Sequence, residues 1–353
     1  MQRITSIDAL RAFALLGILL VHVTYAAGFG ALNYTNTVDS LLGAGVWHLF
    51  VGRFVLIFNT LFGVSFYIIL SKKDYPASRF VWRCFLLALL GLLNGVFFSH
   101  DVLFKYGVCG MFLVPLRKLS GKWIMGIILA LFAAGVFLVG QDWGSFIECP
   151  FRYVEGLSFV EFLKTYPSFL LSLAKDFLNG YYLLIYSTMA IGYLLGRSGV
   201  IEAMDSKLTA THVVISLSIY LLLGALSLAF KNIFLVKRIL CLSGAAFYWI
   251  LFVWLYNKSG FCHRLFSRFE PYGKLGLTNY TMQGFSGVLV FYLLGLGASL
   301  PFTLKFLLAL VFFGLQAVFS AVWLKHFRNG PLEYLWRCAT ARKWLPLRAG
   351  PTA

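Results

Sequence analysis

Ten apolar runs, separated by short polar intervals, constrain the fold of this chain more than any other feature. A transmembrane helix needs about 20 apolar residues to cross roughly 30 Å of hydrocarbon. The runs cover residues 8–27, 46–70, 82–99, 102–117, 123–140, 176–196, 209–230, 238–256, 275–297 and 302–325. Only 12% of the residues are charged, whereas soluble domains average about 25%. We therefore expect an all-α integral membrane protein with about ten transmembrane helices over residues 1–325.

Basic residues are concentrated in alternate loops between these runs. One set of loops carries them at 72–83, 117–122, 197–207 and 258–274 and in the tail from 325 to 348, while the other set holds only Lys231, Lys237 and Arg238 outside the long connection 141–175. The positive-inside rule places the basic set in the cytoplasm, together with both termini. Residues 326–353 then form a basic cytoplasmic tail suited to anionic membrane lipids. The net charge of +17 is spread between apolar runs, so we expect no nucleic-acid partner.

Three further segments bear on the organisation of the chain. Residues 1–27 are similar to a signal peptide, but Asp8 and Arg11 inside the segment favour a retained first helix. The third and fourth runs are separated only by residues 99–101, which predicts a tight helical hairpin. The amphipathic connection 141–175 favours simple packing at the membrane surface over a cover for an external cavity. The six cysteines form no CxxC pair, so we expect neither a disulfide framework nor a metal site.

The first run carries a polar stripe made of Asp8, Arg11 and His22. At 100° per residue these side chains fall within an arc of about 60° on one helix face. Such a stripe is costly in a membrane unless it faces protein or water. In one interpretation the three residues are catalytic, with His22 as a general base. In the other, Asp8 and Arg11 pair at i and i+3 while His22 bonds to a neighbouring helix.

Polar side chains in the other runs are candidates for substrate binding. These are Arg53, Asn59, His100, Asp101, Asn279 and Gln283. Arg53 and Asp101 both belong near the outer side, where they could pair, with or without His100, or be solvated independently. Asn279 and Gln283 face the same way at i and i+4, and such amides usually join helices together.

Glu333 and Arg337 lie at i and i+4 just beyond the last run. We expect them to form a local helix pair with an anchoring role. Phosphate-binding glycine loops, His-Glu-x-x-His and Gly-x-Ser-x-Gly are absent from the sequence, so nucleotide hydrolysis, zincin proteolysis and the hydrolase nucleophile elbow lack support.

Several short motifs resemble the YeiB-like family of bacterial inner-membrane proteins, classed as domain of unknown function 418. They are Ile7-Asp8-Ala9-Leu10-Arg11, Phe50-Val51-Gly52-Arg53-Phe54, Asp101-Val102-Leu103, Gly273-Lys274-Leu275 with Leu277-Thr278-Asn279-Tyr280, and Gly330-Pro331-Leu332-Glu333-Tyr334-Leu335-Trp336-Arg337. The resemblance covers essentially the whole chain. It implies a multi-pass protein of the bacterial inner membrane and leaves the activity open.

A second resemblance bears on the activity. Membrane acyltransferases of the acyltransferase-3 type and the lysosomal heparan acetyltransferase group are similar in having about ten helices. In the former, an Arg followed after ten residues by a His on the first helix is associated with acyl transfer, and Arg11 and His22 have this spacing. The resemblance implies an acyl-CoA donor, no permanently bound cofactor, and a lipid or glycan acceptor in the envelope.

Two other functions remain open at this point. The first is a transporter or exporter of a small, possibly anionic solute along a path lined by Arg11, Arg53, His100 and Asp101. Transporters often contain inverted repeats, and no clear internal duplication is seen in this sequence. The second is a scaffold that has no substrate.

Overall fold

A computed structural model describes residues 5–24, 34–72, 74–98, 101–141, 163–164, 166–230, 233–287 and 300–348. All extended regular elements in these residues are helices. They are α1 (Thr5–Thr24), α2 (Thr37–Leu49), α3 (Arg53–Leu70), α4 (Ala77–Asn94), α5 (Leu103–Met111), the 3-10 helix η1 (Val114–Lys118), α6 (Gly121–Gln141), α8 (Tyr166–Leu178), α9 (Tyr181–Arg197), α10 (Val200–Lys207), α11 (Ala210–Ala229), α12 (Phe234–Lys258), α13 (Gly260–Ser267), α14 (Glu270–Lys274), α15 (Gly276–Gly287), α17 (Phe302–His326) and α18 (Pro331–Ala341).

The expected all-α membrane architecture is confirmed, but the described helices fit fewer spans than the ten apolar runs. Seven segments are long and apolar enough to cross a membrane, and the bent pair α9 and α10 would make an eighth. The run 102–117 contains only the nine-residue α5 followed by η1. Nine residues rise about 14 Å, which is too short to cross the hydrocarbon.

Two apolar runs are interrupted by glycines in the left-handed conformation. Gly52 has φ +79° and separates α2 from α3, and Gly180 has φ +77° and separates α8 from α9. Other residues adopt this conformation only at an energetic cost, so glycine is favoured at such breaks. The runs are continuous in hydropathy, yet a helix ends and another begins at each of these glycines.

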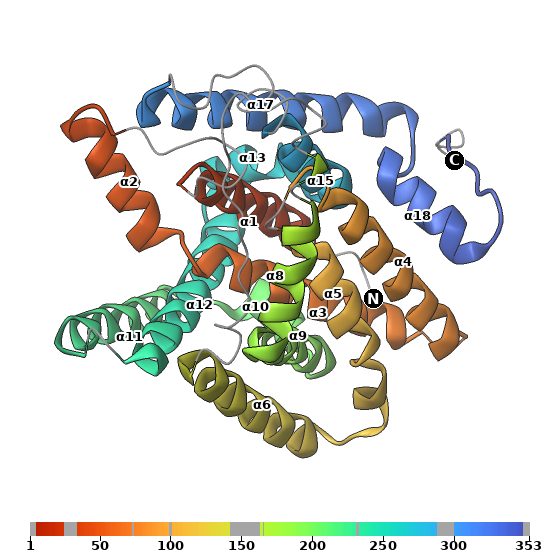
Figure 1. Cartoon of the computed structure of the whole chain (residues 1–353), viewed down its shortest axis with the longest axis horizontal. Helices are drawn as coiled ribbons and strands as arrows, with labels where there is room; N and C mark the ends of the chain where they lie inside the picture. The colour runs from red at the N-terminus through yellow and green to blue at the C-terminus, as the bar shows by residue number, and fades with distance from the viewer. Residues whose placement is uncertain are drawn as a thin grey trace.

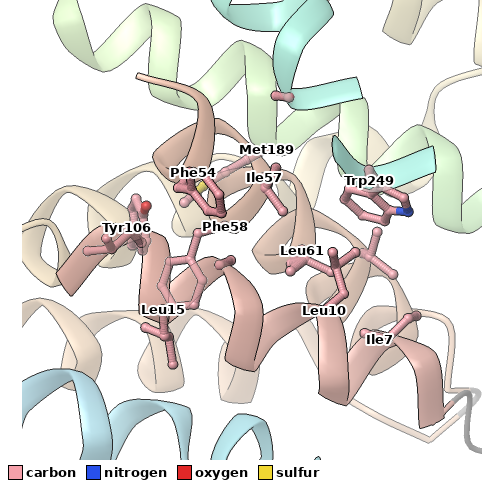
Figure 2. Packing of buried hydrophobic residues seen from close by; sticks show 14 of the residues in the cluster. Ile7, Leu10, Leu15, Phe54, Ile57, Phe58, Leu61, Tyr106, Met189 and Trp249 are labelled. Atoms are coloured by element: carbon pink, nitrogen blue, oxygen red, sulfur yellow. The ribbon is translucent and has the colours of Figure 1, made fainter. Parts of the chain in front are cut away.

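Helix α1 lies in the middle of the molecule, with the other helices arranged around it (Figure 1). Its residues Leu10 and Leu15 are fully buried, and they belong to the same apolar cluster as Phe58 and Leu61 of α3 and Met189 of α9 (Figure 2). Because lipid is as apolar as these side chains, close packing rather than exclusion of water stabilises such contacts. Of the polar residues of α1, Ser6 and Asp8 are buried, and Arg11 and His22 are partly buried.

Glycines allow several helix pairs to approach to backbone contact. A Cβ atom added to Gly63 of α3 would lie 1.9 Å from the carbonyl oxygen of Met189, and one added to Gly192 of α9 would lie 1.9 Å from that of Thr60. Likewise, a Cβ on Gly273 of α14 would lie 1.8 Å from the carbonyl oxygen of Asp8. Small residues at helix crossings are typical of membrane proteins. These crossings bring α3 into backbone contact with α9, and α1 into backbone contact with α14.

The two ends of the molecule differ in charge and structure. At one end, the N-terminus of α2 is tied to α17, because Asp39 accepts a hydrogen bond of 2.8 Å from the backbone N–H of Thr303. At the other end, α18 packs against α4, where the indole N–H groups of Trp82 and Trp336 donate to backbone oxygens of the opposite helix (Figure 1). We call this second end the basic face, because Lys72, Arg79, Arg117 and Arg337 lie there. The positive-inside rule predicts that it faces the cytoplasm.

Candidate functional site

A cavity of about 230 Å³, which we call the central cavity, opens between α1, α3, α4 and α5 on one side and α14, α15 and α18 on the other. Its polar lining includes the cations Arg11, Arg83 and Lys274 and the carboxylate Glu333, and its aromatic lining comprises Phe58, Phe62, Phe66, Tyr280 and Trp336. Most ligand pockets have this combination of apolar walls and a few polar groups. The central cavity is therefore the candidate binding site.

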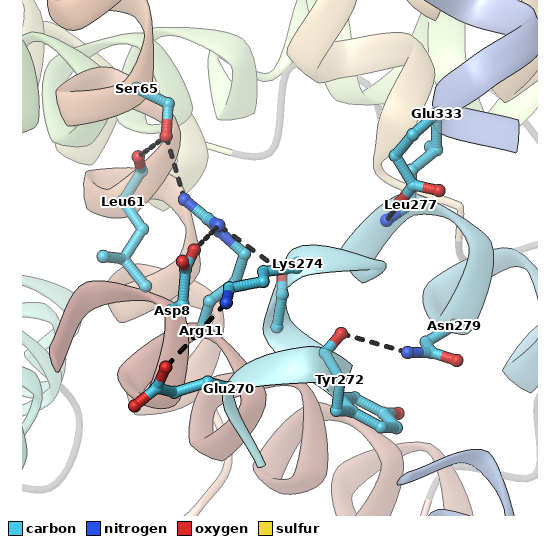
Figure 3. Close-up of polar contacts among 11 residues, drawn as sticks. Asp8, Arg11, Leu61, Ser65, Glu270, Tyr272, Lys274, Leu277, Asn279 and Glu333 are labelled. Carbon is cyan, nitrogen blue, oxygen red and sulfur yellow. Dashed lines mark hydrogen bonds and ion pairs between the residues drawn. The ribbon is translucent and has the colours of Figure 1, made fainter. Parts of the chain in front are cut away.

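Arg11 enters the central cavity from α1 with its guanidinium group held on several sides. Nη1 donates to Asp8 at 2.9 Å and to the carbonyl oxygen of Gly273 at 3.4 Å, while Nη2 donates to Ser65 at 3.1 Å (Figure 3). The pair expected between Asp8 and Arg11 at i and i+3 is thus present. Because three helices supply these partners, Arg11 is positioned rigidly at the cavity wall.

His22 lies at the other end of α1, about 16 Å of helical rise from Arg11. Its ring centroid is 4.5 Å from that of Phe98 and 6.4 Å from that of Tyr280. Tyr280 lines the central cavity, whereas His22 does not. The polar stripe on α1 is therefore divided, with Arg11 at the cavity and His22 behind Tyr280.

Asp101 is fully buried close to the same tyrosine. Its carboxylate accepts hydrogen bonds from the amide of Asn94 at 2.8 Å and from the backbone N–H of Phe104 at 3.2 Å, which caps α5. The hydroxyl of Tyr280 accepts from the backbone N–H of the adjacent Val102 at 3.2 Å. Tyr280 thus contacts both the segment that follows Asp101 and the His22 ring. The other candidate in this segment, His100, lies outside the described residues.

Arg53 has partners of its own and does not pair with Asp101. It donates to the backbone oxygen of Val51 at 2.8 Å, and its guanidinium carbon lies 5.8 Å from the ring centroid of Tyr220. Of the two alternatives left open by the sequence, the described structure does not contain the Arg53–Asp101 pair, and each group has separate partners. Arg53 lies at the start of α3 and Asp101 lies in the α4–α5 turn, and the two side chains contact different neighbours. Two residues expected on the same side of the membrane therefore need not form a pair.

The three candidate amides lie in buried hydrogen-bond networks outside the lining of the central cavity. Asn59 donates to Thr188 of α9 at 3.1 Å and accepts from Tyr106 of α5. Asn279 and Gln283 connect α15 to α1, α14 and α17. The amide of Asn279 donates to the backbone oxygen of Tyr272 and to the hydroxyl of Ser320, both at 3.0 Å. The amide of Gln283 donates to the hydroxyl of Tyr272 at 2.8 Å and to the backbone oxygen of Leu15 at 3.4 Å. This geometry agrees with a helix-joining role.

Glu333 caps a different helix instead of pairing with Arg337. Its carboxylate accepts from the backbone N–H of Leu277 at 2.7 Å, from that of Thr278 at 3.1 Å, and from the Thr278 hydroxyl. Arg337 instead donates to Asn329. The expected local pair is therefore wrong, since orphan N–H groups at the start of α15 are stronger partners than an exposed side chain one turn away.

Replacing Glu333 with alanine should lower the free energy of unfolding by about 1–3 kcal/mol, because two buried N–H groups of α15 would lose their acceptor. Burial raises the pKa of the Glu333 carboxyl, against the opposing effect of its hydrogen bonds from Thr278 and Leu277. A neutral acceptor is thus tolerated, and Glu333→Gln should cost less than Glu333→Ala. Thermal unfolding in detergent measures both, with the exposed Asp74→Ala as control. An equal loss in Asp74→Ala would contradict the capping role.

Sequence reasoning did not select several residues that line the central cavity. Ser65, Lys274 and Trp336 were not singled out for a site, and Arg83 was counted only as a topology signal. The available signal was the position of Arg83 inside the apolar run 82–99, since charges within a span are expensive unless they have a role. The partners of Arg83 come from α18, about 250 residues later, so the sequence could not indicate the cavity itself.

Comparisons with known proteins match the chain along its length. Residues 3–236 match the family described as "Heparan-alpha-glucosaminide N-acetyltransferase, catalytic", and residues 195–343 match "Protein of unknown function (DUF418)". An uncharacterized 39.9 kDa protein of Bacillus acidopullulyticus is 26% identical, over 98% of this chain and 96% of its own length. The uncharacterized protein YeiB of Escherichia coli K12 is 28% identical, over 97% of each.

The lining of the central cavity draws on both matched regions. Arg11, Ser65 and Arg83 belong to the region that matches the acetyltransferase family, whereas Tyr280 and Glu333 belong to the part matched only by the second family. The cavity is thus complete only when both parts of the chain are folded together.

Proposed function

This chain belongs to the YeiB-like DUF418 family and to the family of the heparan-alpha-glucosaminide N-acetyltransferase catalytic domain, and we propose that it is a membrane-bound acyltransferase. The donor is an acyl thioester such as an acyl-CoA, which enters the central cavity from the basic face. The acceptor is a hydroxyl or amine of an envelope lipid or glycan, which reaches His22 from the opposite side. The observation that carries the proposal is the central cavity, with cations at one part of its wall and Tyr280, next to His22, at another.

The lining of the central cavity suits a donor that has an anionic end and an apolar end. Arg83 and Lys274 offer positive charge to anionic groups, and the rings of Phe58, Phe62 and Tyr280 offer an apolar surface to an acyl thioester. The guanidinium group of Arg11 already donates to Asp8 and Ser65. In this proposal Arg11 therefore forms part of the cavity wall and contributes less to binding the donor.

In this proposal His22 acts as the general base. In the reaction its imidazole removes the proton of the acceptor O–H or N–H while the acceptor atom attacks the thioester carbonyl carbon. The carbon–sulfur bond then breaks, and the leaving thiolate takes the proton from the imidazolium to give a free thiol. The rings of Phe98 and Tyr280 lie beside the imidazole. The proposal requires a movement of Tyr280 that opens the central cavity to His22.

The proposal is tested with the purified full chain in nanodiscs of phosphatidylcholine. We expect saturable binding of acetyl-CoA by calorimetry and release of free thiol that depends on an added acceptor fraction of envelope lipid or glycan. Absence of thioester binding by a folded sample would overturn the proposal. Solute flux in proteoliposomes that is independent of thioester would also contradict it and favour a transporter.

A further inference from the structure

A second cavity of about 320 Å³ lies on the basic face and shares Ile69 and Arg83 with the central cavity. We call it the basic cavity. Its other charged lining residues are Lys72, Arg79 and Arg337, and no carboxylate is among the residues that line it in the described part of the chain. Four cations around one hollow repel one another, which favours the binding of an anion between them.

Arg83 is held at the junction of the two cavities by Trp336. The guanidinium carbon lies 3.6 Å from the centroid of the Trp336 ring, and the indole N–H donates to the backbone oxygen of Arg83 at 2.9 Å. The Nε atom of Arg83 is buried and has no hydrogen-bond partner among the described residues. Buried donors normally have an acceptor, and an anion bound beside Arg83 would supply one if the guanidinium group turned toward the cavity.

The neighbouring cations are also positioned by contacts with the protein. The guanidinium group of Arg79 lies 5.6 Å from the ring centroid of Tyr75, and Arg337 donates to Asn329. Both side chains remain exposed toward the basic cavity, and each keeps free N–H groups. One planar guanidinium group can donate two parallel N–H groups to two oxygens of the same phosphate. Phosphate is therefore the best match for this lining.

We infer that the basic cavity binds the phosphate groups of the acyl donor, while the rest of the donor extends past Arg83 into the central cavity. This inference rests on the proposed acyltransferase function. It assigns phosphate binding to Arg79, Arg83 and Arg337. The same phosphate chemistry occurs in the headgroup of an anionic lipid, and the experiment below separates the two sources.

The test measures binding of coenzyme A, of adenosine 3′,5′-bisphosphate and of pantetheine to the full chain in phosphatidylcholine nanodiscs. In the double variant Arg79→Gln/Arg337→Gln, the Kd of both phosphate-bearing ligands should rise about tenfold or more, because charge-assisted hydrogen bonds are lost. Pantetheine carries no phosphate, so its Kd should stay within about twofold, which also verifies that the variant is folded. The matched control is Arg268→Gln, an exposed arginine that lines neither cavity.

A change of less than about twofold in the Kd of coenzyme A in the double variant would overturn the inference and leave the acyltransferase proposal standing. The opposite outcome is also informative. If adenosine 3′,5′-bisphosphate binding depends on Arg79 and Arg337 but the protein transfers no acyl group, the basic cavity is a phosphate site and the acyltransferase proposal is refuted. Native mass spectrometry of the protein from phosphatidylglycerol nanodiscs measures how much of this anionic lipid stays bound. Loss of retained phosphatidylglycerol in the double variant, with unchanged coenzyme A binding, would assign the cavity to a lipid headgroup and overturn the donor assignment.

Discussion

His22→Ala is expected to reduce the rate of acyl transfer by about 10²–10⁴-fold, the usual contribution of a general base. The donor should still bind with a Kd within about twofold of the original, because His22 does not line the central cavity. A thiol-release assay with a saturating acyl thioester measures the rate, and calorimetry measures the Kd. The combination of lost turnover and retained binding is specific to a chemical role.

His22→Gln is the companion variant for this experiment. Glutamine keeps a polar group next to Phe98 and Tyr280 but cannot take up a proton near neutral pH. If the side chain only joins helices, His22→Gln should retain most of the activity, whereas a general base predicts that both variants are inactive. Transfer at the normal rate in either variant would exclude His22 as the base.

Gly192→Val should destabilise the protein by more than about 3 kcal/mol, an effect large enough to prevent isolation of a folded protein. A Cβ atom at this position would lie 1.9 Å from the carbonyl oxygen of Thr60, and a backbone oxygen cannot move away by changing a rotamer. Helices α3 and α9 would have to separate along their whole crossing. Size-exclusion chromatography and thermal unfolding in detergent give the measurement.

Gly224→Ala in α11 is the matched control, because nothing lies within 4 Å of the position of its Cβ atom. Alanine is the better helix former, so this variant should unfold at the same temperature as the original protein or slightly above it. If Gly192→Val and Gly224→Ala behaved alike, the close crossing of α3 and α9 would not determine stability.

The sequence predicted the features that depend on local composition. Apolar runs identified the long helices because hydropathy is a property of each segment alone. The Asp8–Arg11 pair followed from i, i+3 spacing on one helix. The breaks at Gly52 and Gly180 were missed, because a single glycine inside a continuous apolar run does not reveal that its φ is positive.

Contacts between distant segments could not be predicted in this way. Glu333 binds the backbone N–H of Leu277, 56 residues earlier, although a local pair with Arg337 satisfied the same sequence pattern. Arg53 and Asp101 were expected on one side of the membrane, but sharing a side does not imply contact. The central cavity depends on Arg83 meeting Trp336, so its existence follows only from the packing of α18 on α4.

Tyr280 separates the central cavity from His22, with the ring centroids of Phe58 and His22 each 6.4 Å from its own. Moving one elementary charge across an energised membrane releases about 2.3 kcal/mol for each 100 mV of potential, so any open aqueous route would dissipate that potential. The buried ring of Tyr280 opposes the passage of hydrated protons, and the proposed transfer requires this ring to turn aside for the acyl group. If the proposed transfer operates, Tyr280 would therefore control both the access of the thioester to His22 and the leak of protons.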